Sequence, residues 1–188
     1  MSDLDASLDA ATATAAAAGA GGRRSGPLLS IAPSPTVPPR GFVRDVYEHT
    51  WTIARPRADV WRWLCDPATF TDGQIPPFRV EFLTNPVGET GFHEGVYNSH
   101  VGPLMCFAGV LGEIRHEEYR DLQYTYGSYA ISHALFRPVR LQFWLDDDPT
   151  ATADPGDGGA RCVLHLRLDT DVRAGRAVGV WQRMMGVF

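Results

Sequence analysis

The stretch from His49 to Asp66 changes its hydrophobic period, and this change limits what the chain can fold into. Every second position from His49 to Ile53 carries an aromatic or apolar side chain, which predicts a half-buried strand. After Pro56, apolar side chains recur at helical spacing. That helix should end at Asp66, because the following Pro67 disfavours the α-helical conformation for Asp66. A strand that leads directly into a short amphipathic helix is therefore predicted.

Most of the remaining chain alternates between apolar and polar side chains, as strands do. Residues 67–72 predict a second short helix or a turn, and Phe78–Leu83 predicts a strand. Further strands are expected at Gly95–Val101, Met105–Arg115, Leu122–Ile131, Val139–Asp146 and Arg161–Thr170. Most of the connections between them are short, so neighbouring strands should form antiparallel hairpins.

The last segment, residues 172–188, returns to a helical period. Apolar side chains recur along one stripe at Ala174, Val178, Trp181, Met185 and Phe188. A helix with so broad an apolar face must cover a large apolar partner, and the sheet is the partner that this chain offers. The pattern therefore predicts a C-terminal helix that packs on the sheet.

The first forty residues differ from the rest in composition. They are rich in alanine, glycine, serine and proline and hold few large apolar groups, so they would bury too little surface to offset the entropy of ordering. We expect residues 1–40 to be disordered and residues 41–188 to form one domain. The aspartates that precede the alanine run do not fit a secretory signal, which carries positive charge there.

The charged residues exclude several kinds of chemistry. All seventeen basic residues are arginines, and the formal net charge is −5. Without lysine, the chain cannot form a Schiff base, anchor pyridoxal phosphate or use the lysine of a phosphate-binding P-loop. The arginines are scattered rather than clustered, so nucleic acid is not an expected partner. No apolar run approaches the roughly 20 residues of a membrane-spanning helix.

Cysteine and histidine spacing predicts neither a metal site nor a disulfide framework. Cys65, Cys106 and Cys162 lie far apart in apolar contexts, which is typical of reduced thiols in a cytoplasmic protein. The six histidines show no metal-ligand spacing, and no nucleotide-binding glycine motif occurs. We therefore expect no metal and no cofactor.

The order of elements resembles the helix-grip fold of the START-like, or SRPBCC, superfamily, which includes polyketide cyclase/dehydrase and lipid-transport types. The stretch Thr52–Trp61, TIARPRADVW, is similar to that superfamily's entry into its first helix. Phe107–Val110, Leu122–Tyr124 and the closing amphipathic helix add to the likeness. The resemblance implies an α+β fold in which a curved antiparallel sheet of about seven strands wraps around a long C-terminal helix, with two short helices after the first strand.

This resemblance also implies an apolar cavity between the sheet and the C-terminal helix. Large side chains spread over the strands and the last helix are the expected lining. We expect a hydrophobic ligand to contact Trp51, Tyr97, Phe107, Tyr124, Tyr126, Trp144, Trp181 and Met185. The polar candidates for acid–base chemistry are His49, His100 and Tyr124.

Three functions remain open at this stage. The first is the binding of a hydrophobic small molecule, such as a lipid, a polyketide or an aromatic compound. The second is a metal-free enzyme of the polyketide cyclase/dehydrase type, in which His49, His100 or Tyr124 would act on the bound molecule. The third is a module that binds a protein partner and holds no ligand. For any of these functions, the chain could also pair with a second copy of itself as a homodimer.

Overall fold

The computed structural model describes residues 34–74, 76–84, 87–125, 128–131, 133–149 and 160–186. Residues 1–33, which hold most of the segment expected to be disordered, lie outside this part of the chain. The elements are, in chain order, β1 (Phe42–Ile53), α2 (Arg57–Cys65), α3 (Pro67–Thr71), β2 (Arg79–Phe82), β3 (Tyr97–Gly102), β4 (Met105–Arg115), β5 (Tyr119–Tyr124), β6 (Tyr129–Ala130), β7 (Phe136–Asp147), β8 (Cys162–Arg173) and α4 (Arg176–Met185).

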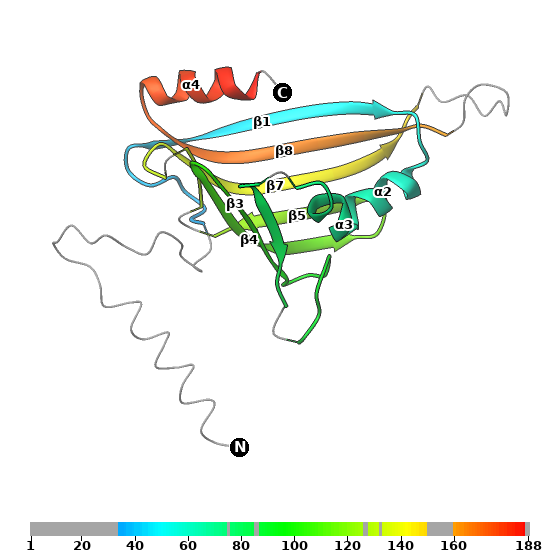
Figure 1. Cartoon of the computed structure of the whole chain (residues 1–188). Helices are drawn as coiled ribbons and strands as arrows, with labels where there is room; N and C mark the ends of the chain where they lie inside the picture. The colour runs from blue at the N-terminus through cyan, green and yellow to red at the C-terminus, as the bar shows by residue number, and fades with distance from the viewer. Residues whose placement is uncertain are drawn as a thin grey trace.

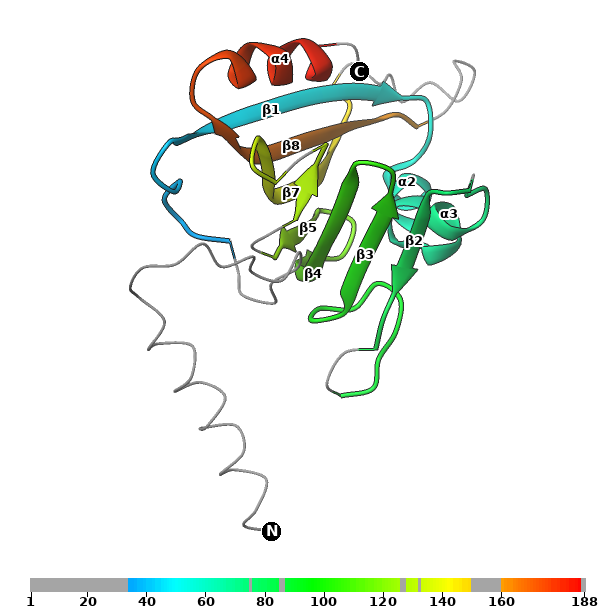
Figure 2. The same ribbon diagram turned by 60° about the vertical axis from the view of Figure 1, so that its left-hand side comes forward.

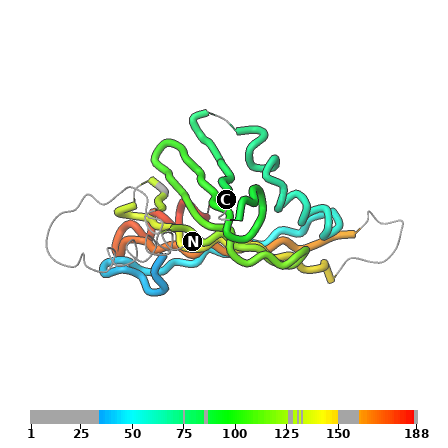
Figure 3. The backbone as a smooth tube through the Cα atoms, turned by 90° about the horizontal axis from the view of Figure 1, so that it is seen from below, coloured from blue at the N-terminus to red at the C-terminus, as the bar shows by residue number. Residues whose placement is uncertain are grey.

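All of the strands join one antiparallel sheet. Its order is β1-β8-β7-β5-β4-β3-β2, and the short β6 pairs with β4 off this path. Figure 1 shows the long strands β1, β8 and β7 side by side. In the view of Figure 3, the green strands rise out of the plane of the others, so the sheet is curved. The expected α+β helix-grip architecture, with two short helices after the first strand, is thereby confirmed.

The helices α2, α3 and α4 lie over two ends of the sheet. The helices α2 and α3 cover one end of the long strands, while α4 lies near the other end, as Figures 1 and 2 show. The side chains of Val60, Trp61 and Leu64 on α2 pack against Leu145 and Leu164 of β7 and β8. We call the sheet face that carries Leu145 and Leu164 the inner face.

Some strand boundaries differ from the sequence-based prediction. The expected strand Leu122–Ile131 divides into β5 and β6. The hydroxyls of Thr125 and Ser128 each donate to the carbonyl oxygen of Ala108, at 3.0 and 2.8 Å, and hold the chain between the two strands. The strand β5 also begins earlier than expected, at Tyr119, because a three-residue turn joins it to Arg115 of β4.

The C-terminal helix is shorter than the apolar stripe predicted. The strand β8 continues to Arg173, which pairs with Phe42, so the helix cannot begin at residue 172. Gly175 has a φ of 100°, a conformation that side chains with a Cβ rarely adopt, and it turns the chain into α4. The helix then runs for ten residues.

The contact between α4 and the sheet is filled by side chains. Trp181 is 4% exposed and packs with Phe136 and Val172, and the ring centroids of Trp181 and Phe136 lie 5.1 Å apart. Met185 packs against the same cluster. The expected cavity under the C-terminal helix is therefore occupied at this place by Trp181 and its neighbours.

Residues that precede Gly41, the expected start of the domain, contact the sheet. The Ser34 hydroxyl donates to the carbonyl oxygen of Tyr124 at 2.8 Å, and the Arg44 guanidinium donates to the carbonyl oxygen of Pro35 at 3.2 Å. These bonds hold the proline-rich segment against the sheet. Within the described residues, no helix is long and apolar enough to cross a membrane.

Truncation of Trp181 tests the packing of α4. Because the indole is buried against Phe136 and Val172, we expect Trp181→Ala to lower the free energy of unfolding by about 3–5 kcal/mol, as measured by urea denaturation. Val180 on the same helix is 51% exposed, so the control Val180→Ala should change it by less than about 0.5 kcal/mol. A similar small loss for both variants would show that the sheet does not hold this helix.

Candidate functional site

A large hollow on the inner face lies between the sheet and the helices α2 and α3. It has a volume of about 540 Å³. Phe143 and Leu164 come from the sheet, Leu64 from α2 and Phe70 from α3. The remaining lining is Trp51, Thr52, Ile53, Ala54, Trp63 and Arg120. We call this space the main hollow, and its walls are almost entirely apolar.

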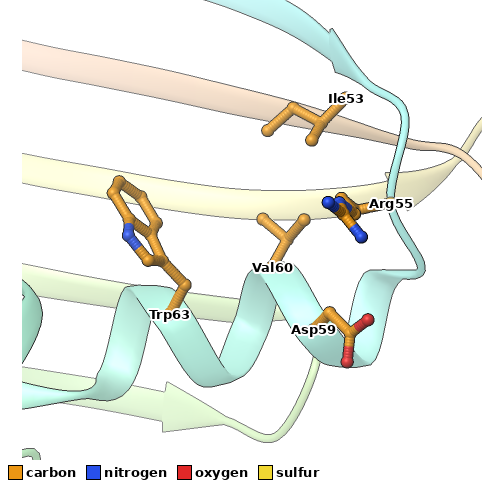
Figure 4. Close-up of a pocket in the computed structure, with 5 residues that line it drawn as sticks. All are labelled: Ile53, Arg55, Asp59, Val60 and Trp63. Atoms are coloured by element: carbon orange, nitrogen blue, oxygen red, sulfur yellow. The ribbon is translucent and has the colours of Figure 1, made fainter.

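A second hollow of about 400 Å³ adjoins the main one at Ile53 and Trp63, which line both. Figure 4 shows the side chains of Ile53, Val60 and Trp63 reaching into the space between α2 and β1. Arg55 and Asp59 complete its lining and bring charge to the outer edge. The two hollows together leave an apolar surface open beside α2.

On the other side, the main hollow adjoins a narrow space of about 60 Å³, which we call the narrow end. Phe70, Arg120 and Phe143 line both spaces. The ring centroids of Phe70 and Phe92 lie 5.5 Å apart, and those of Phe82 and Phe92 lie 4.9 Å apart. Among the described residues that line the narrow end, the polar ones are Asn98, His100 and Arg120. Its shape is therefore an aromatic enclosure around a few polar side chains.

Arg120 is the most unusual residue of this enclosure. The whole residue is 4% exposed, and its guanidinium carbon lies 4.6 Å from the ring centroid of Phe143, 4.8 Å from that of Phe92 and 5.7 Å from that of Phe70. Among the described residues, no carboxylate forms an ion pair with it, and its Nε has no hydrogen-bond partner. The cation is surrounded by aromatic faces instead of by an acid.

Burial has a clear electrostatic cost at this position. Desolvation lowers the pKa of Arg120 to about 10, although the nearby Cys65 and Tyr124 act in the opposite direction. The guanidinium nevertheless stays charged at neutral pH. Each cation–π contact stabilises it by about 0.5–2 kcal/mol, whereas the effective penalty for a buried ion reaches several kcal/mol. The three aromatic contacts therefore offset part of this cost, and no carboxylate among the described residues adds to them.

The other titratable groups near Arg120 are held neutral. Burial and the positive charge of Arg120 both lower the pKa of His100, so its imidazole is uncharged at neutral pH. Burial raises the pKa of the Tyr124 hydroxyl, which keeps its proton. Burial also raises the pKa of the Cys65 thiol, which makes a thiolate nucleophile unfavourable there. Arg120 is thus the charged group at the centre of a neutral surrounding.

The structure brings some of the residues predicted from the sequence to this region. Trp51 lines the main hollow, and the ring of His49 lies 4.3 Å from it by centroid on the same face of β1. His100 lines the narrow end. Tyr124 packs with Phe107 beside these spaces, with their ring centroids 5.6 Å apart.

Other predicted residues lie elsewhere. Trp144 alternates with Phe143 and therefore points to the outer face, where its ring stacks on that of His165 at 4.9 Å. Tyr97 alternates with Asn98 and points outward as well. Trp181 and Met185 of α4 pack between this helix and the sheet, and they line neither hollow. Tyr126 lies outside the described residues.

Sequence reasoning missed Arg120 and the phenylalanines around it. Arg120 shares its face of β5 with Leu122 and Tyr124, so strict alternation would have placed it inside. That signal was lost because the strand was expected to begin at Leu122. Phe70 and Phe92 lie in a short helix and a connection, where no periodic pattern marks them.

Comparison with solved structures identifies the fold. Norcoclaurine synthase from Thalictrum flavum, in complex with dopamine and hydroxybenzaldehyde, matches 77% of this chain and 78% of its own at 14% identity and a TM-score of 0.50. A truncated form of the same synthase matches 79% of this chain and 87% of its own at 14% identity and a TM-score of 0.51. At this identity the likeness shows the fold alone, which agrees with the helix-grip fold expected from the sequence, and it indicates no particular activity. No protein-family model matches the chain, and no curated protein matches it in sequence.

Replacement of Arg120 by an apolar side chain tests the cost of its burial. Because the cation has no acid partner among the described residues, we expect Arg120→Met to raise the free energy of unfolding by about 1 kcal/mol or more in urea denaturation. The exposed Arg79 provides a control, and Arg79→Met should change it by less than about 0.5 kcal/mol. A clear loss in Arg120→Met would mean that the aromatic contacts outweigh the desolvation of the charge.

The pH dependence of stability tests the surroundings of His100. Its pKa in the folded protein lies below the ordinary value of 6.5, so the unfolded chain binds more protons as the solution becomes acidic. Stability should therefore fall as the pH drops through 6.5 towards the folded pKa. We expect urea denaturation at about pH 7.5 and about pH 5 to show a larger loss in the wild type than in His100→Gln. The exposed His116 supplies the control His116→Gln, which should behave like the wild type. Equal losses in wild type and His100→Gln would contradict the assignment.

Proposed function

We propose that this protein binds a hydrophobic small molecule in the main hollow, between the inner face of the sheet and the helices α2 and α3. The observation that carries the proposal is the hollow itself, about 540 Å³ in volume with nearly apolar walls. Pockets for small ligands in proteins typically measure about 300–1,000 Å³ and are lined mainly by apolar and aromatic groups.

Two tryptophans at the edge of the main hollow support this proposal. Trp63 is 56% exposed and Trp51 is 37% exposed, although both are large apolar side chains. Exposed apolar surface that rims a hollow is typical of a binding site, because a ligand that covers it removes that surface from water. An aromatic ring also offers a ligand a flat face for stacking.

The comparison with norcoclaurine synthase is compatible with this use of the fold. That protein was solved with dopamine and hydroxybenzaldehyde, which are two small aromatic molecules. The helix-grip fold can therefore accommodate aromatic compounds of this size. For the present chain, the ligand class proposed is a lipid-like, polyketide or aromatic compound, and the proposal depends on the hollow rather than on the likeness.

A second candidate function is a metal-free acid–base enzyme of the cyclase or dehydratase type. It is favoured by one observation, the neutral imidazole of His100 at the narrow end, beside the charged Arg120. A neutral histidine can accept a proton from a bound molecule, and a nearby cation stabilises the negative charge that this leaves. Turnover of a bound compound that stops in His100→Gln, with binding retained, would establish the enzyme.

Calorimetric titration with an uncharged bicyclic aromatic compound, 2-naphthamide, tests the proposed function. We expect saturable binding at one site and a rise in stability of about 2.7 kcal/mol at a hundredfold excess over Kd. Trp63→Ala should weaken binding about tenfold, a loss of about 1.4 kcal/mol, because the ligand loses a stacking face.

Trp144 on the outer face provides the matched control. Trp144→Ala should bind 2-naphthamide as the wild type does. If the wild type binds no aromatic or aliphatic probe, whether charged or uncharged, the ligand-binding proposal fails. The exposed tryptophans would then favour the remaining alternative, a module that binds a protein partner.

A further inference from the structure

Arg120 differs from three other arginines of the sheet, each of which pairs with an acid. Arg44 pairs with Asp171, Arg140 pairs with Asp121, and Arg167 pairs with Asp169 and Glu48. The first two of these acids are at most 2% exposed, so the chain satisfies even its buried charges on the outer face. Among the described residues, Arg120 is nearly fully buried and yet has no acid beside it.

The nearest carboxylate in sequence cannot serve Arg120. Asp121 follows it directly on β5, and alternation places the two side chains on opposite faces of the sheet. Asp121 is held on the outer face by Arg140 at 2.5 Å. The inner face therefore keeps a guanidinium whose donors remain available, because its aromatic neighbours cannot accept an ordinary hydrogen bond.

The position of Arg120 makes it accessible to a ligand. It lines both the main hollow and the narrow end, so it lies where the two spaces meet. A molecule whose apolar body occupies the main hollow would reach the guanidinium with one end. At the same place, Asn98 Oδ1 and Arg120 Nε are both buried without a hydrogen-bond partner among the described residues, so the narrow end holds an unused acceptor and an unused donor.

We propose that the ligand of the main hollow is an apolar carboxylic acid whose carboxylate pairs with the buried guanidinium of Arg120. This inference rests on the proposed function, since it names the class of molecule bound at the same site. A planar carboxylate matches the fork of guanidinium N–H groups in two parallel hydrogen bonds. It supplies the negative charge that the described part of the chain does not place there.

The same arrangement explains the choice of arginine over an apolar residue. A methionine at position 120 would fill the space without any charge to desolvate. An arginine caged by three phenylalanines is fixed in place before the ligand arrives, so little side-chain freedom is lost on binding. Low local polarity then strengthens its interaction with an anion.

The test compares 2-naphthoate with 2-naphthamide, which has the same ring system and no charge, by calorimetric titration at neutral pH. We expect the wild type to bind the carboxylate at least about tenfold more tightly, as is typical for a charge-assisted pair in a buried site. In Arg120→Met this preference should disappear while 2-naphthamide still binds. The control Arg167→Met removes a charge from the outer face and should keep the preference.

A second measurement needs no substitution at Arg120. Burial and, to a smaller extent, the charge of Arg120 lower the pKa of His100. A bound carboxylate should oppose the effect of that charge and raise the pKa, whereas 2-naphthamide should not. NMR titration of the wild type follows the imidazole directly. If Arg120→Met fails to fold, two measurements on the wild type still test the carboxylate inference: the pKa of His100 with each compound bound, and the preference for 2-naphthoate over 2-naphthamide.

The outcomes separate the two proposals. Equal affinity of the wild type for both compounds overturns the carboxylate inference and leaves the binding of apolar molecules standing. Preference for 2-naphthoate without any change in the pKa of His100 also overturns it, because the anion would then bind away from Arg120. If neither compound binds, the proposed function itself fails, and the inference fails with it.

Discussion

The full-length pairing of β1 with β8 determines where every other element can lie. These strands are far apart in sequence, yet they pair antiparallel from Phe42 opposite Arg173 to Ile53 opposite Cys162. The helix that follows β1 must therefore begin at one end of the long strands, and the helix that follows β8 must begin at the other. Gly175 and the turn at Arg55–Pro56 direct both helices over the sheet. With α4 only ten residues long, neither α4 nor α2 covers the whole inner face, and the main hollow lies beside α2.

Alternation along β5 separates two charges that look like natural partners in the sequence. Arg120 and Asp121 are adjacent, but a strand points successive side chains to opposite faces, so Asp121 pairs with Arg140 and Arg120 faces the phenylalanines. A register change of one residue would exchange them and place a carboxylate inside the aromatic enclosure. The sign of the charge that meets a ligand is thus set by strand register rather than by composition.

Much of the fold could be predicted from the sequence because it depends on local periodicity. The change of period after Ile53 predicted β1 and α2, and the alternating segments predicted most of the strands. The length of α4 could not be predicted, since the apolar pattern at 172–174 serves a strand as well as a helix. Pairing of Arg173 with Phe42, a long-range contact, decides between them.

The candidate site could be predicted only in part, for a related reason. Trp144 shares its face of β7 with Arg140 and Gln142, so alternation with polar neighbours favours the outer face for it. Its aromatic ring favours the cavity instead, and the sequence offers no way to decide between the two signals. Trp51 and His100 were placed near the site, whereas Phe70 and Phe92 reach Arg120 from a five-residue helix and a connection. Such contacts depend on how the chain folds back on itself, and no local pattern encodes them.

The elements that enclose Arg120 differ in how firmly the sheet holds them. Phe82 belongs to β2, a four-residue strand at the edge of the sheet, and Phe70 belongs to the short helix α3. Short elements with few backbone hydrogen bonds open locally at a lower free energy than long, doubly paired strands. Phe143, by contrast, is part of β7, which has a partner on both sides. One wall of the enclosure therefore belongs to the doubly paired part of the sheet, and the opposite wall belongs to short elements for which local opening costs less free energy.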